Sequence, residues 1–239
     1  MTNLAPDNAV IASAANRALG IPVGTVRSRT FLHRAPGRAV ERLVFADRTM
    51  VLKWRTGRVS DREALLYREL TSEVKLLLRL PDFLGATCIE GTHFLFLECV
   101  EGTPLDWTGR HHVRHGFEHL GRLHGQTAAF ITDAPHRLAS QEAHPELWYE
   151  RPVGSDEDPL VLDPGDLHGE NFLLRPNGTV CLVDLENMAV RPRLRALRQL
   201  REDPSLPTGE MADIALTAYW AAAGWRGDYG AFRCRFTDT

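Results

Sequence analysis

The sequence is poor in several features that mark common classes of protein. Its four cysteines, Cys88, Cys99, Cys181 and Cys234, are widely spaced and form no CxxC pair, which argues against a disulfide framework and a structural zinc site. No apolar run approaches the roughly 18 residues that would cross a bilayer, and Asp7 stands where a signal peptide would need positive charge. We therefore expect a cytoplasmic protein without a membrane partner.

Positive charge is not in excess either. The chain has 28 lysines and arginines against 31 aspartates and glutamates, which gives a net charge of −3. Proteins that bind nucleic-acid phosphates usually carry a basic surplus, so nucleic acid is not the expected partner. The 239 residues are 44% hydrophobic and 25% charged, an ordinary globular composition with enough chain for one large or two small domains.

The first half of the chain is mostly extended in character. Apolar runs over residues 39–46 and 49–54 predict an antiparallel hairpin. One helix is predicted over residues 61–80, because apolar residues recur there at three- and four-residue intervals. A short amphipathic helix over residues 7–19, stopped by Gly20, precedes the extended region.

The second half is mainly helical. Apolar residues recur at helical spacing through residues 110–129 and 209–223. We take the end of the last extended run, at residue 100, as the boundary between an N-terminal lobe, residues 1–100, and a C-terminal lobe, residues 101–239. The pattern predicts an α+β fold, with an antiparallel sheet and one helix first and a mainly helical lobe after it.

The section from residue 160 to residue 186 carries the most informative polar residues. Within it, Asn177-Gly178 lies between two apolar runs and predicts a β-hairpin with a two-residue loop. In that register Asn171 faces Asp184, and directly opposed side chains have Cβ atoms about 4.5–5.5 Å apart on one face of a sheet. An amide oxygen held beside a carboxylate suits Mg²⁺, which prefers oxygen ligands.

Asp166 lies five residues before Asn171, on the loop that leads into this hairpin. A carboxylate beside metal-bound phosphate can orient an attacking hydroxyl and accept its proton. The alternative is that the run from Asp163 to Asp166 is only a turn and Asp184 only a solvated strand end. Taken alone, the hairpin favours this alternative.

The order of the whole set resembles the aminoglycoside phosphotransferase and choline kinase family, which are small-molecule relatives of protein kinases. The family pattern HGDxHxxN, followed by a strand and then DxE, is matched by Gly165, Asp166, His168, Asn171, Asp184 and Glu186. The resemblance implies a bilobal protein-kinase-like fold, with Asp166 as the catalytic base and with Asn171 and Asp184 as Mg²⁺ ligands. It implies ATP as the nucleotide, with GTP also possible.

Lysine is scarce, since Lys53 and Lys75 are the only two in the chain. The run Val51-Leu52-Lys53 resembles the family strand whose lysine contacts the ATP phosphates, and alternation along a strand puts Val51 on the same face, against the adenine. The alternative is a solvated strand lysine.

Glu63 begins the predicted helix on its apolar face. Residues 62–70 resemble the corresponding helix of the family, which implies an ion pair between Glu63 and Lys53. The alternative is a capping box with Ser60, in which the glutamate serves its own helix terminus.

Residues 94–102 resemble the strand and hinge of the family, whose backbone binds the adenine edge, so Glu98 and Val100 are expected at the nucleotide. A buried edge strand has the same sequence pattern. The assignment therefore depends on the order of the motifs along the chain.

Several other polar groups are interpreted as structural. His124 is expected to be a packed histidine. A basic run of five arginines between residues 191 and 201 is expected to form a solvated surface, and the alternative is that it binds an anionic substrate or partner. An acidic loop over residues 141–159 is either solvated or a rim that attracts polycations. The basic run consists of Arg191, Arg193, Arg195, Arg198 and Arg201.

Pro164 stands where the family usually has the histidine that braces the catalytic loop. Two functions from different classes therefore remain. The first is an ATP- and Mg²⁺-dependent phosphotransferase acting on a hydroxyl of a small molecule, such as an aminoglycoside or another sugar-like antibiotic or natural product. The second is a nucleotide-binding pseudokinase that acts as a scaffold or regulator. Asp166, Asn171, Asp184 and Lys53 favour the first; Pro164 and a short C-terminal lobe favour the second.

Overall fold

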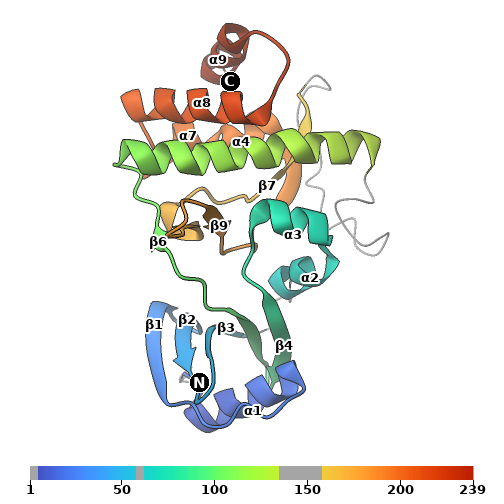
Figure 1. Cartoon of the computed structure of the whole chain (residues 1–239), viewed down its shortest axis with the longest axis vertical. Helices are drawn as coiled ribbons and strands as arrows, with labels where there is room; N and C mark the ends of the chain where they lie inside the picture. Colours follow the sequence, from blue (N-terminus) through green and yellow to red (C-terminus); the bar gives the residue numbers. More distant parts are fainter. Residues whose placement is uncertain (1–4, 58–61, 135–157, 239) are drawn as a thin grey trace. The chain divides into compact units, whose positions relative to one another are not determined.

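A computed structural model describes residues 5–57, 62–134 and 158–238 (Figure 1). The chain divides into two compact units, one made of residues 1–68 and 81–100 and the other of residues 69–80 and 101–239. Within the described residues, no helix combines the length and hydrophobicity needed to cross a bilayer.

The first unit contains a five-stranded antiparallel sheet in the order β1-β2-β3-β5-β4. Its strands are β1 (Ser28–Ala35), β2 (Arg38–Val44), β3 (Thr49–Thr56), β4 (Phe83–Ile89) and β5 (Thr92–Glu98). Two helices accompany it, α1 (Asn8–Leu19) and α2 (Arg62–Glu69). The predicted hairpin is confirmed, because β2 and β3 pair in register from Val44 opposite Thr49 to Arg38 opposite Arg55.

The core of the first unit lies between α1 and one face of this sheet (Figure 1). Met50, Leu52 and Trp54 alternate along β3 and are buried in the same cluster as Ile11 of α1. The residues between them, Val51 and Lys53 included, are partly exposed and belong to the other face of β3. The pleat of β3 thus directs Lys53 away from the apolar core.

The predicted N-terminal helix is confirmed together with its two ends. The side chain of Asp7 accepts a hydrogen bond from the backbone N–H of Val10 at 2.8 Å, and Gly20 adopts a left-handed conformation with φ of 68°. An acidic cap satisfies an otherwise unpaired N–H, and glycine enters the left-handed region without steric cost.

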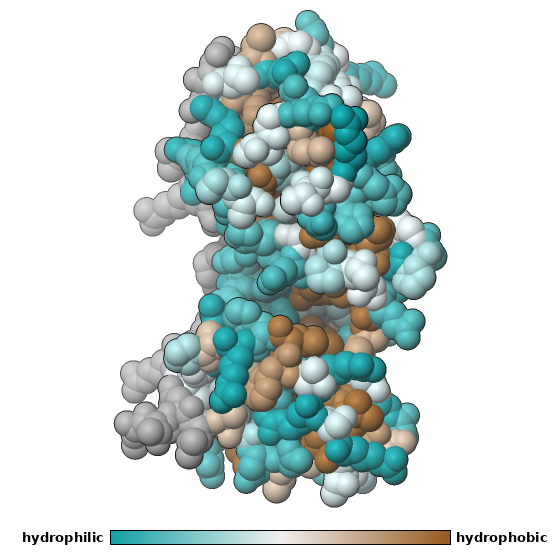
Figure 2. Space-filling view, turned by 90° about the vertical axis from the view of Figure 1, so that its left-hand side faces the viewer, coloured by the Kyte–Doolittle hydropathy of each residue, from teal (hydrophilic) through white to brown (hydrophobic). Residues whose placement is uncertain are grey.

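The edge strand β1 carries exposed apolar side chains, Phe31 and Leu32 among them. Figure 2, in which the side that carries β1 faces the viewer, shows hydrophobic side chains among hydrophilic ones on the surface of this unit. The guanidinium groups of Arg29 and Arg34 lie 5.8 and 4.8 Å from the centroid of the Phe31 ring. Cationic side chains of this kind disfavour pairing of an exposed sheet edge with another chain.

The single helix predicted over residues 61–80 is wrong, because the chain forms two helices, α2 and α3 (Ser72–Leu78). Thr71 between them is extended, with ψ of 157°, and its hydroxyl accepts a hydrogen bond from the backbone N–H of Val74. Such a residue caps a new helix rather than continuing an old one. Leu66, Leu70 and Val74 are all buried, so the periodicity is real although the helix is interrupted.

The break also changes the division of the chain. Residues 69–80 belong to the second unit, whereas the sequence assigned all of residues 1–100 to the first. Ser60, the predicted cap of the long helix, lies outside the described residues.

The second unit combines helices with short sheets. Its helices after α3 are α4 (Arg110–Asp133), the 3₁₀ turn η2 (Gly169–Asn171), α6 (Arg193–Leu197), α7 (Gln199–Glu202), α8 (Glu210–Ala223) and α9 (Tyr229–Asp238). One sheet has the order β6-β8-β9 and a second consists of β10 and β7. These strands are β6 (Thr103–Pro104), β7 (Leu160–Asp163), β8 (Phe172–Leu174), β9 (Val180–Leu182) and β10 (Ala189–Pro192).

The basic run forms the expected solvated surface only in part, since Arg195, Arg198 and Arg201 are exposed and the other two arginines are not. Arg191 is largely buried, and Arg193 is buried with its Nη2 3.0 Å from Asp158 Oδ1. The guanidinium of Arg193 lies 4.9 Å from the ring centroid of Trp225 and 5.1 Å from that of Phe232. Two of the five arginines thus hold the interior of the second unit together. The acidic loop lies largely outside the described residues, which resume at 158.

The long helix α4 packs directly against α8 (Figure 1). Gly121 and Gly125 lie at the contact, where a Cβ at either position would collide with a carbonyl oxygen of α8, that of Tyr219 or that of Ala223. The two predicted helices over residues 110–129 and 209–223 are confirmed. Their backbones approach closely because two glycines one helical turn apart leave the space.

Replacing Gly125 with alanine should destabilise the second unit. A methyl group has no space opposite the Ala223 carbonyl, and overpacking of this kind costs about 1–3 kcal/mol, which exceeds the gain of about 1 kcal/mol in helix propensity. Urea unfolding followed by circular dichroism measures the change. Gln126→Ala, at an exposed position of the same helix, is the matched control. Equal stability of Gly125→Ala and the control would contradict the close packing.

Candidate active site around Asp166

The strand β7 is held on α4 by buried polar contacts. The hydroxyl of Thr127 accepts a hydrogen bond from the backbone N–H of Leu162 at 3.1 Å. His124 is fully buried, with Nδ1 3.0 Å from the Tyr219 hydroxyl and Nε2 3.8 Å from Asp163 Oδ1. The prediction that His124 is a packed structural residue is confirmed. Burial raises the pKa of Tyr219, so its hydroxyl stays protonated.

Asp163 ends β7 and is fully buried. Arg191 of β10 forms an ion pair with it, with 2.5 Å between Nη1 and Asp163 Oδ2. The same guanidinium donates from Nη2 to the carbonyl oxygen of Asn187 at 3.0 Å. A buried carboxylate needs such a partner, since desolvation of an unpaired charge is very costly. The ion pair therefore holds the end of β7 in place where the next loop begins.

Residues 164–168, which we call the Asp166 loop, have no regular secondary structure. Gly165 has φ of 80°, and a Cβ there would collide with the carbonyl oxygen of Asn187. Glycine is required at this position because any side chain would meet both strain and a clash. The Asp166 loop is thereby packed closely against the segment that precedes β10.

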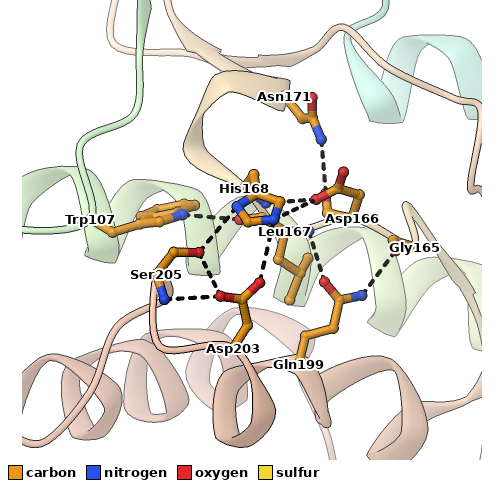
Figure 3. A network of polar contacts seen from close by, with 9 residues as sticks. All are labelled: Trp107, Gly165, Asp166, Leu167, His168, Asn171, Gln199, Asp203 and Ser205. Atoms are coloured by element: carbon orange, nitrogen blue, oxygen red, sulfur yellow. Dashed lines mark hydrogen bonds and ion pairs between the residues drawn. The ribbon is translucent and has the colours of Figure 1, made fainter.

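The Asp166 side chain is one-third exposed, at 33% of its surface. Its Oδ1 accepts a hydrogen bond from the backbone N–H of His168 at 3.1 Å, and the other oxygen points away from His168 (Figure 3). Oδ2 accepts no hydrogen bond from any side chain or backbone group that the structure describes. One carboxylate oxygen is thus positioned and the other is available to a substrate.

Asn171 ends the turn η2 directly after the Asp166 loop. Its Nδ2 donates to the carbonyl oxygen of Asp166 at 3.4 Å, so the amide oxygen points away from the Asp166 loop (Figure 3). Asp184 follows β9, and its Oδ1 accepts a hydrogen bond from the backbone N–H of Glu186 at 3.1 Å. Each residue thus makes a hydrogen bond to the backbone nearby.

The predicted hairpin between these residues exists, but its predicted register is wrong by one residue. Leu174 pairs with Val180 and Leu173 with Cys181, whereas a two-residue loop would pair Leu174 with Cys181. Asn171 is accordingly opposite Val183, whose backbone N–H donates to its carbonyl oxygen at 3.0 Å. The argument that Asn171 and Asp184 are directly opposed therefore fails.

The turn explains the shift in register. Its loop has three residues, because Arg175 and Thr179 form the closing pair, with Arg175 N–H donating to the Thr179 carbonyl at 2.9 Å. Gly178 N–H donates to the Arg175 carbonyl, and Gly178 has φ of 78°. A type I turn with proline in its second position, followed by a left-handed glycine, is the usual three-residue hairpin loop. Pro176 therefore belongs to the loop and not to the strand.

The side chains at this site suit magnesium better than a transition metal. Among the described residues no group of three or more His, Cys, Asp or Glu side chains could hold a metal ion. The predicted ligands, Asn171 and Asp184, would offer an amide oxygen and a carboxylate, and Mg²⁺ commonly takes one or two carboxylates with water and substrate phosphates completing its shell. Their assignment as ligands stays a prediction.

The first unit contains the predicted ion pair between Lys53 and Glu63. The distance from Lys53 Nζ to Glu63 Oε1 is 2.7 Å, and the two side chains are only 17% and 14% exposed. The pairing is confirmed. The capping-box alternative could hold as well only if Glu63 both pairs with Lys53 and caps its own helix. Partial burial makes this pair stronger than an ordinary surface pair.

The predicted hinge residues, Glu98 and Val100, lie at the end of β5 and beyond it. β5 pairs with β3 and with β4, so the edge-strand alternative is wrong. At its end, Glu98 N–H donates to the Asp82 carbonyl at 2.9 Å, and the Glu98 carboxylate accepts from Asp82 N–H at 3.2 Å. Val100 lies beyond the strand in a segment without regular structure. The roles of Glu98 and Val100 at a nucleotide stay predictions.

Four side chains that the sequence did not single out contact the Asp166 loop (Figure 3). The Gln199 amide bonds two of its peptide groups, and Trp107 Nε1 donates to the Leu167 carbonyl at 3.0 Å. The ring of His168 lies 3.2 Å from Ser205 Oγ through Nδ1 and 3.3 Å from Asp203 Oδ2 through Nε2. No local pattern marks these residues, because each lies at least 30 positions from its partner.

Asp203 and Ser205 form a compact unit beside His168. The Ser205 hydroxyl and backbone N–H both donate to Asp203 Oδ1, at 2.6 and 2.9 Å. These bonds hold the pKa of Asp203 below its usual range. A charged carboxylate therefore lies next to the His168 ring.

The comparisons with known proteins rest on structure alone. No protein-family model and no curated protein matches the sequence. A solved spectinomycin phosphotransferase, in complex with ADP and spectinomycin, is similar with a TM-score of 0.59 at 9% identity, over 98% of this chain and 87% of that one.

Two further solved structures agree with it. A macrolide 2′-phosphotransferase from Brachybacterium faecium has a TM-score of 0.54 at 16% identity, over 88% of this chain and 82% of that one. An aminoglycoside-3′-phosphotransferase of type VIII has a TM-score of 0.51 at 19% identity, over 88% and 93%. The chain therefore has the protein-kinase-like fold of small-molecule phosphotransferases, and the fold expected from the resemblance is confirmed.

The Asp163–Arg191 pair should be strongly coupled. Arg191→Met leaves a buried carboxylate without its main partner and should destabilise the protein by about 3–5 kcal/mol, whereas Asp163→Leu with Arg191→Met should cost less than the sum of the single changes. Urea unfolding of the four proteins in this cycle measures the coupling. Arg198→Met, which removes an exposed pair with Glu202, is the control and should change stability by less than about 0.5 kcal/mol. Additive single effects would show that the pair does not hold the site.

Proposed function

We propose that the chain is an ATP- and Mg²⁺-dependent phosphotransferase that transfers the γ-phosphate to a hydroxyl of a small molecule. We favour an aminoglycoside or another sugar-like antibiotic or natural product as the acceptor. The fold shared with phosphotransferases named for spectinomycin, macrolides and aminoglycosides supports this proposal. The ADP in one of those structures favours ATP as the donor over GTP.

The observation that carries the proposal is the state of the Asp166 carboxylate. Oδ1 is occupied by the N–H of His168, the side chain is partly exposed, and Oδ2 is open among the described residues. A carboxylate in this state can orient a hydroxyl and accept its proton while the hydroxyl oxygen bonds to phosphorus. The bond from the γ-phosphorus to the bridging oxygen breaks, and ADP leaves with that oxygen.

The remaining residues take roles that follow from the chemistry of their side chains. Asn171 and Asp184 would hold Mg²⁺, which neutralises charge on the phosphates when it is bound. Lys53, whose ammonium is oriented by Glu63, would contact the α- and β-phosphates.

The adenine would bind to the first unit. Val51 shares a face of β3 with Lys53 and would lie against the base. The backbone near Glu98 and Val100 would bind its polar edge. Each of these contacts is part of the proposal.

A phosphate-transfer screen tests the activity directly. Purified protein is incubated with Mg²⁺ and either ATP or GTP, against aminoglycosides, amino sugars, choline-like alcohols and hydroxylated antibiotics. Products are identified by a mass increase of one phosphoryl group. We expect transfer to at least one hydroxyl acceptor.

The two aspartates should separate chemistry from metal binding. Asp166→Asn removes the proton acceptor but is nearly isosteric, so turnover should fall by roughly 10²–10⁴ while Mg-ATP affinity is retained. Asp184→Asn removes a ligand carboxylate and should weaken Mg-ATP binding as well. Calorimetry and single-turnover assays measure both effects. The control is Asp213→Asn, which changes an exposed carboxylate of α8. An equal loss of activity in this control would show that the effects are not specific to Asp166 and Asp184.

Lys53→Ala should weaken binding of Mg-ATP by roughly 10–100-fold, the range expected when a hydrogen bond to a charged group is lost, with little change in the KM for the acceptor. Lys75→Ala is the matched control, since Lys75 is the only other lysine. Calorimetric titration with Mg-ATP gives the affinities. Unchanged nucleotide affinity in Lys53→Ala would show that this lysine is misassigned.

The pseudokinase alternative predicts a different set of results. It requires wild-type protein that binds Mg-ATP, transfers phosphate to no acceptor in the screen and is unaffected by Asp166→Asn. That combination would replace the enzymatic proposal with a scaffold or regulatory function.

A further inference from the structure

The Asp166 loop makes little hydrogen bonding of its own, the bond from His168 N–H to Asp166 Oδ1 being the one within it among the described residues. It has neither helix nor strand hydrogen bonds, and Pro164 at its start has no backbone N–H to donate. A general base is effective only when its carboxylate is held in the correct direction. Groups outside the loop must therefore fix the backbone of Asp166.

Gln199 of α7 contacts the loop on both sides of Asp166 (Figure 3). Its Nε2 donates to the carbonyl oxygen of Gly165 at 2.9 Å, and its Oε1 accepts from the backbone N–H of Leu167 at 3.1 Å. One primary amide thus bonds the peptide group before Asp166 and the peptide group after it.

These two bonds constrain the direction of the Asp166 side chain. The Gly165 carbonyl lies in the peptide plane before Asp166, and a change in φ of Asp166 rotates that plane relative to its Cα. The Leu167 N–H lies in the peptide plane after Asp166, which a change in ψ rotates in the same way. With both planes tied to one rigid amide, neither dihedral can change without breaking a hydrogen bond. The Cα–Cβ bond of Asp166 is then fixed in space.

We propose that Gln199 is a positioning residue for Asp166, holding the general base in its reactive direction in place of the histidine brace that Pro164 removes. The inference rests on the proposed phosphotransfer. Trp107 and Asn171 contact the loop as well, each through one of its carbonyl oxygens. Gln199 alone, among the described side chains that contact the loop, bonds a peptide group on each side of Asp166.

A neutral primary amide is the side chain that this arrangement requires. It must donate to one peptide group and accept from another, and the Leu167 N–H is buried with Leu167 itself. A carboxylate can accept from Leu167 but cannot donate to Gly165, and a thioether of similar length cannot donate and is only a weak acceptor. The variants Gln199→Glu and Gln199→Met therefore remove one bond and both bonds, respectively.

Hydrogen exchange followed by NMR tests the contact without any assay of activity. In Gln199→Met, exchange of the Leu167 amide should become about tenfold faster, the factor expected for loss of one hydrogen bond. In Gln199→Glu the amide should stay protected, because an acceptor remains. Gln126→Met, the same change at an exposed position of α4, should leave Leu167 unchanged. Unchanged exchange in Gln199→Met would overturn the proposal.

Kinetics with the acceptor found in the screen test the positioning role. Both Gln199 variants should lower kcat by roughly 10–100-fold, the effect of misplacing a reacting group, while calorimetry finds the affinity for Mg-ATP and the KM for ATP unchanged. A purely structural role would alter nucleotide binding and thermal stability together with kcat. Wild-type kcat in Gln199→Met would overturn the proposal.

The two proposals can fail separately. If the wild type transfers phosphate normally and Leu167 exchange does not depend on Gln199, the positioning role is wrong and the phosphotransferase stands. If Leu167 exchange depends on Gln199 but wild-type protein phosphorylates no acceptor, the phosphotransferase is wrong, and the positioning of a base falls with it although the hydrogen bonds remain.

Discussion

The buried ion pair between Asp163 and Arg191 holds the chain at the point where β7 ends and the Asp166 loop begins. Asp163 has no exposed surface, so its charge is tolerable only beside the guanidinium that lies 2.5 Å away. His124 and Thr127 of α4 hold the same strand from the other side. The close packing of α4 on α8, which depends on Gly121 and Gly125, in turn fixes His124 against Tyr219. The direction of Asp166 thus depends on contacts that begin in the interior of the second unit.

Polar side chains, rather than regular secondary structure, hold the Asp166 loop itself. Gln199 forms hydrogen bonds with two of its peptide groups, Trp107 with a third, and Asn171 with the carbonyl side of the Asp166–Leu167 peptide, whose N–H donates to Gln199. Buried peptide groups must find partners, and here each partner is a side chain from another element. These bonds give the loop a defined shape, although it begins with Pro164 where the family that the sequence resembles usually has histidine.

The parts of the site that the sequence predicted correctly are those fixed by local rules. Alternation along β3 is enough to turn Lys53 away from the core, and the helix that follows brings Glu63 within 2.7 Å of it. The hairpin after Asn171 was foreseen from Asn177-Gly178, but its register was wrong because Pro176 joins the loop. Register depends on the loop length, and one added residue shifts every pair of the ladder. The interruption at Thr71 was missed because helical periodicity continues across it.

The sequence by itself determined the class of fold and the two kinds of secondary structure, because periodicity and residue type act over a few neighbouring positions. The residues proposed for phosphoryl transfer came from the order of motifs that resembles a known family. Only the tertiary structure decided which side chains hold those residues in place. Gln199 is 32 residues from Leu167, and Arg191 is 28 residues from Asp163. Arg191 and Arg193 look like a solvated basic run in the sequence and are interior residues in the fold. Such pairings arise only when distant segments pack together, since a buried polar group takes whichever partner the packing brings to it.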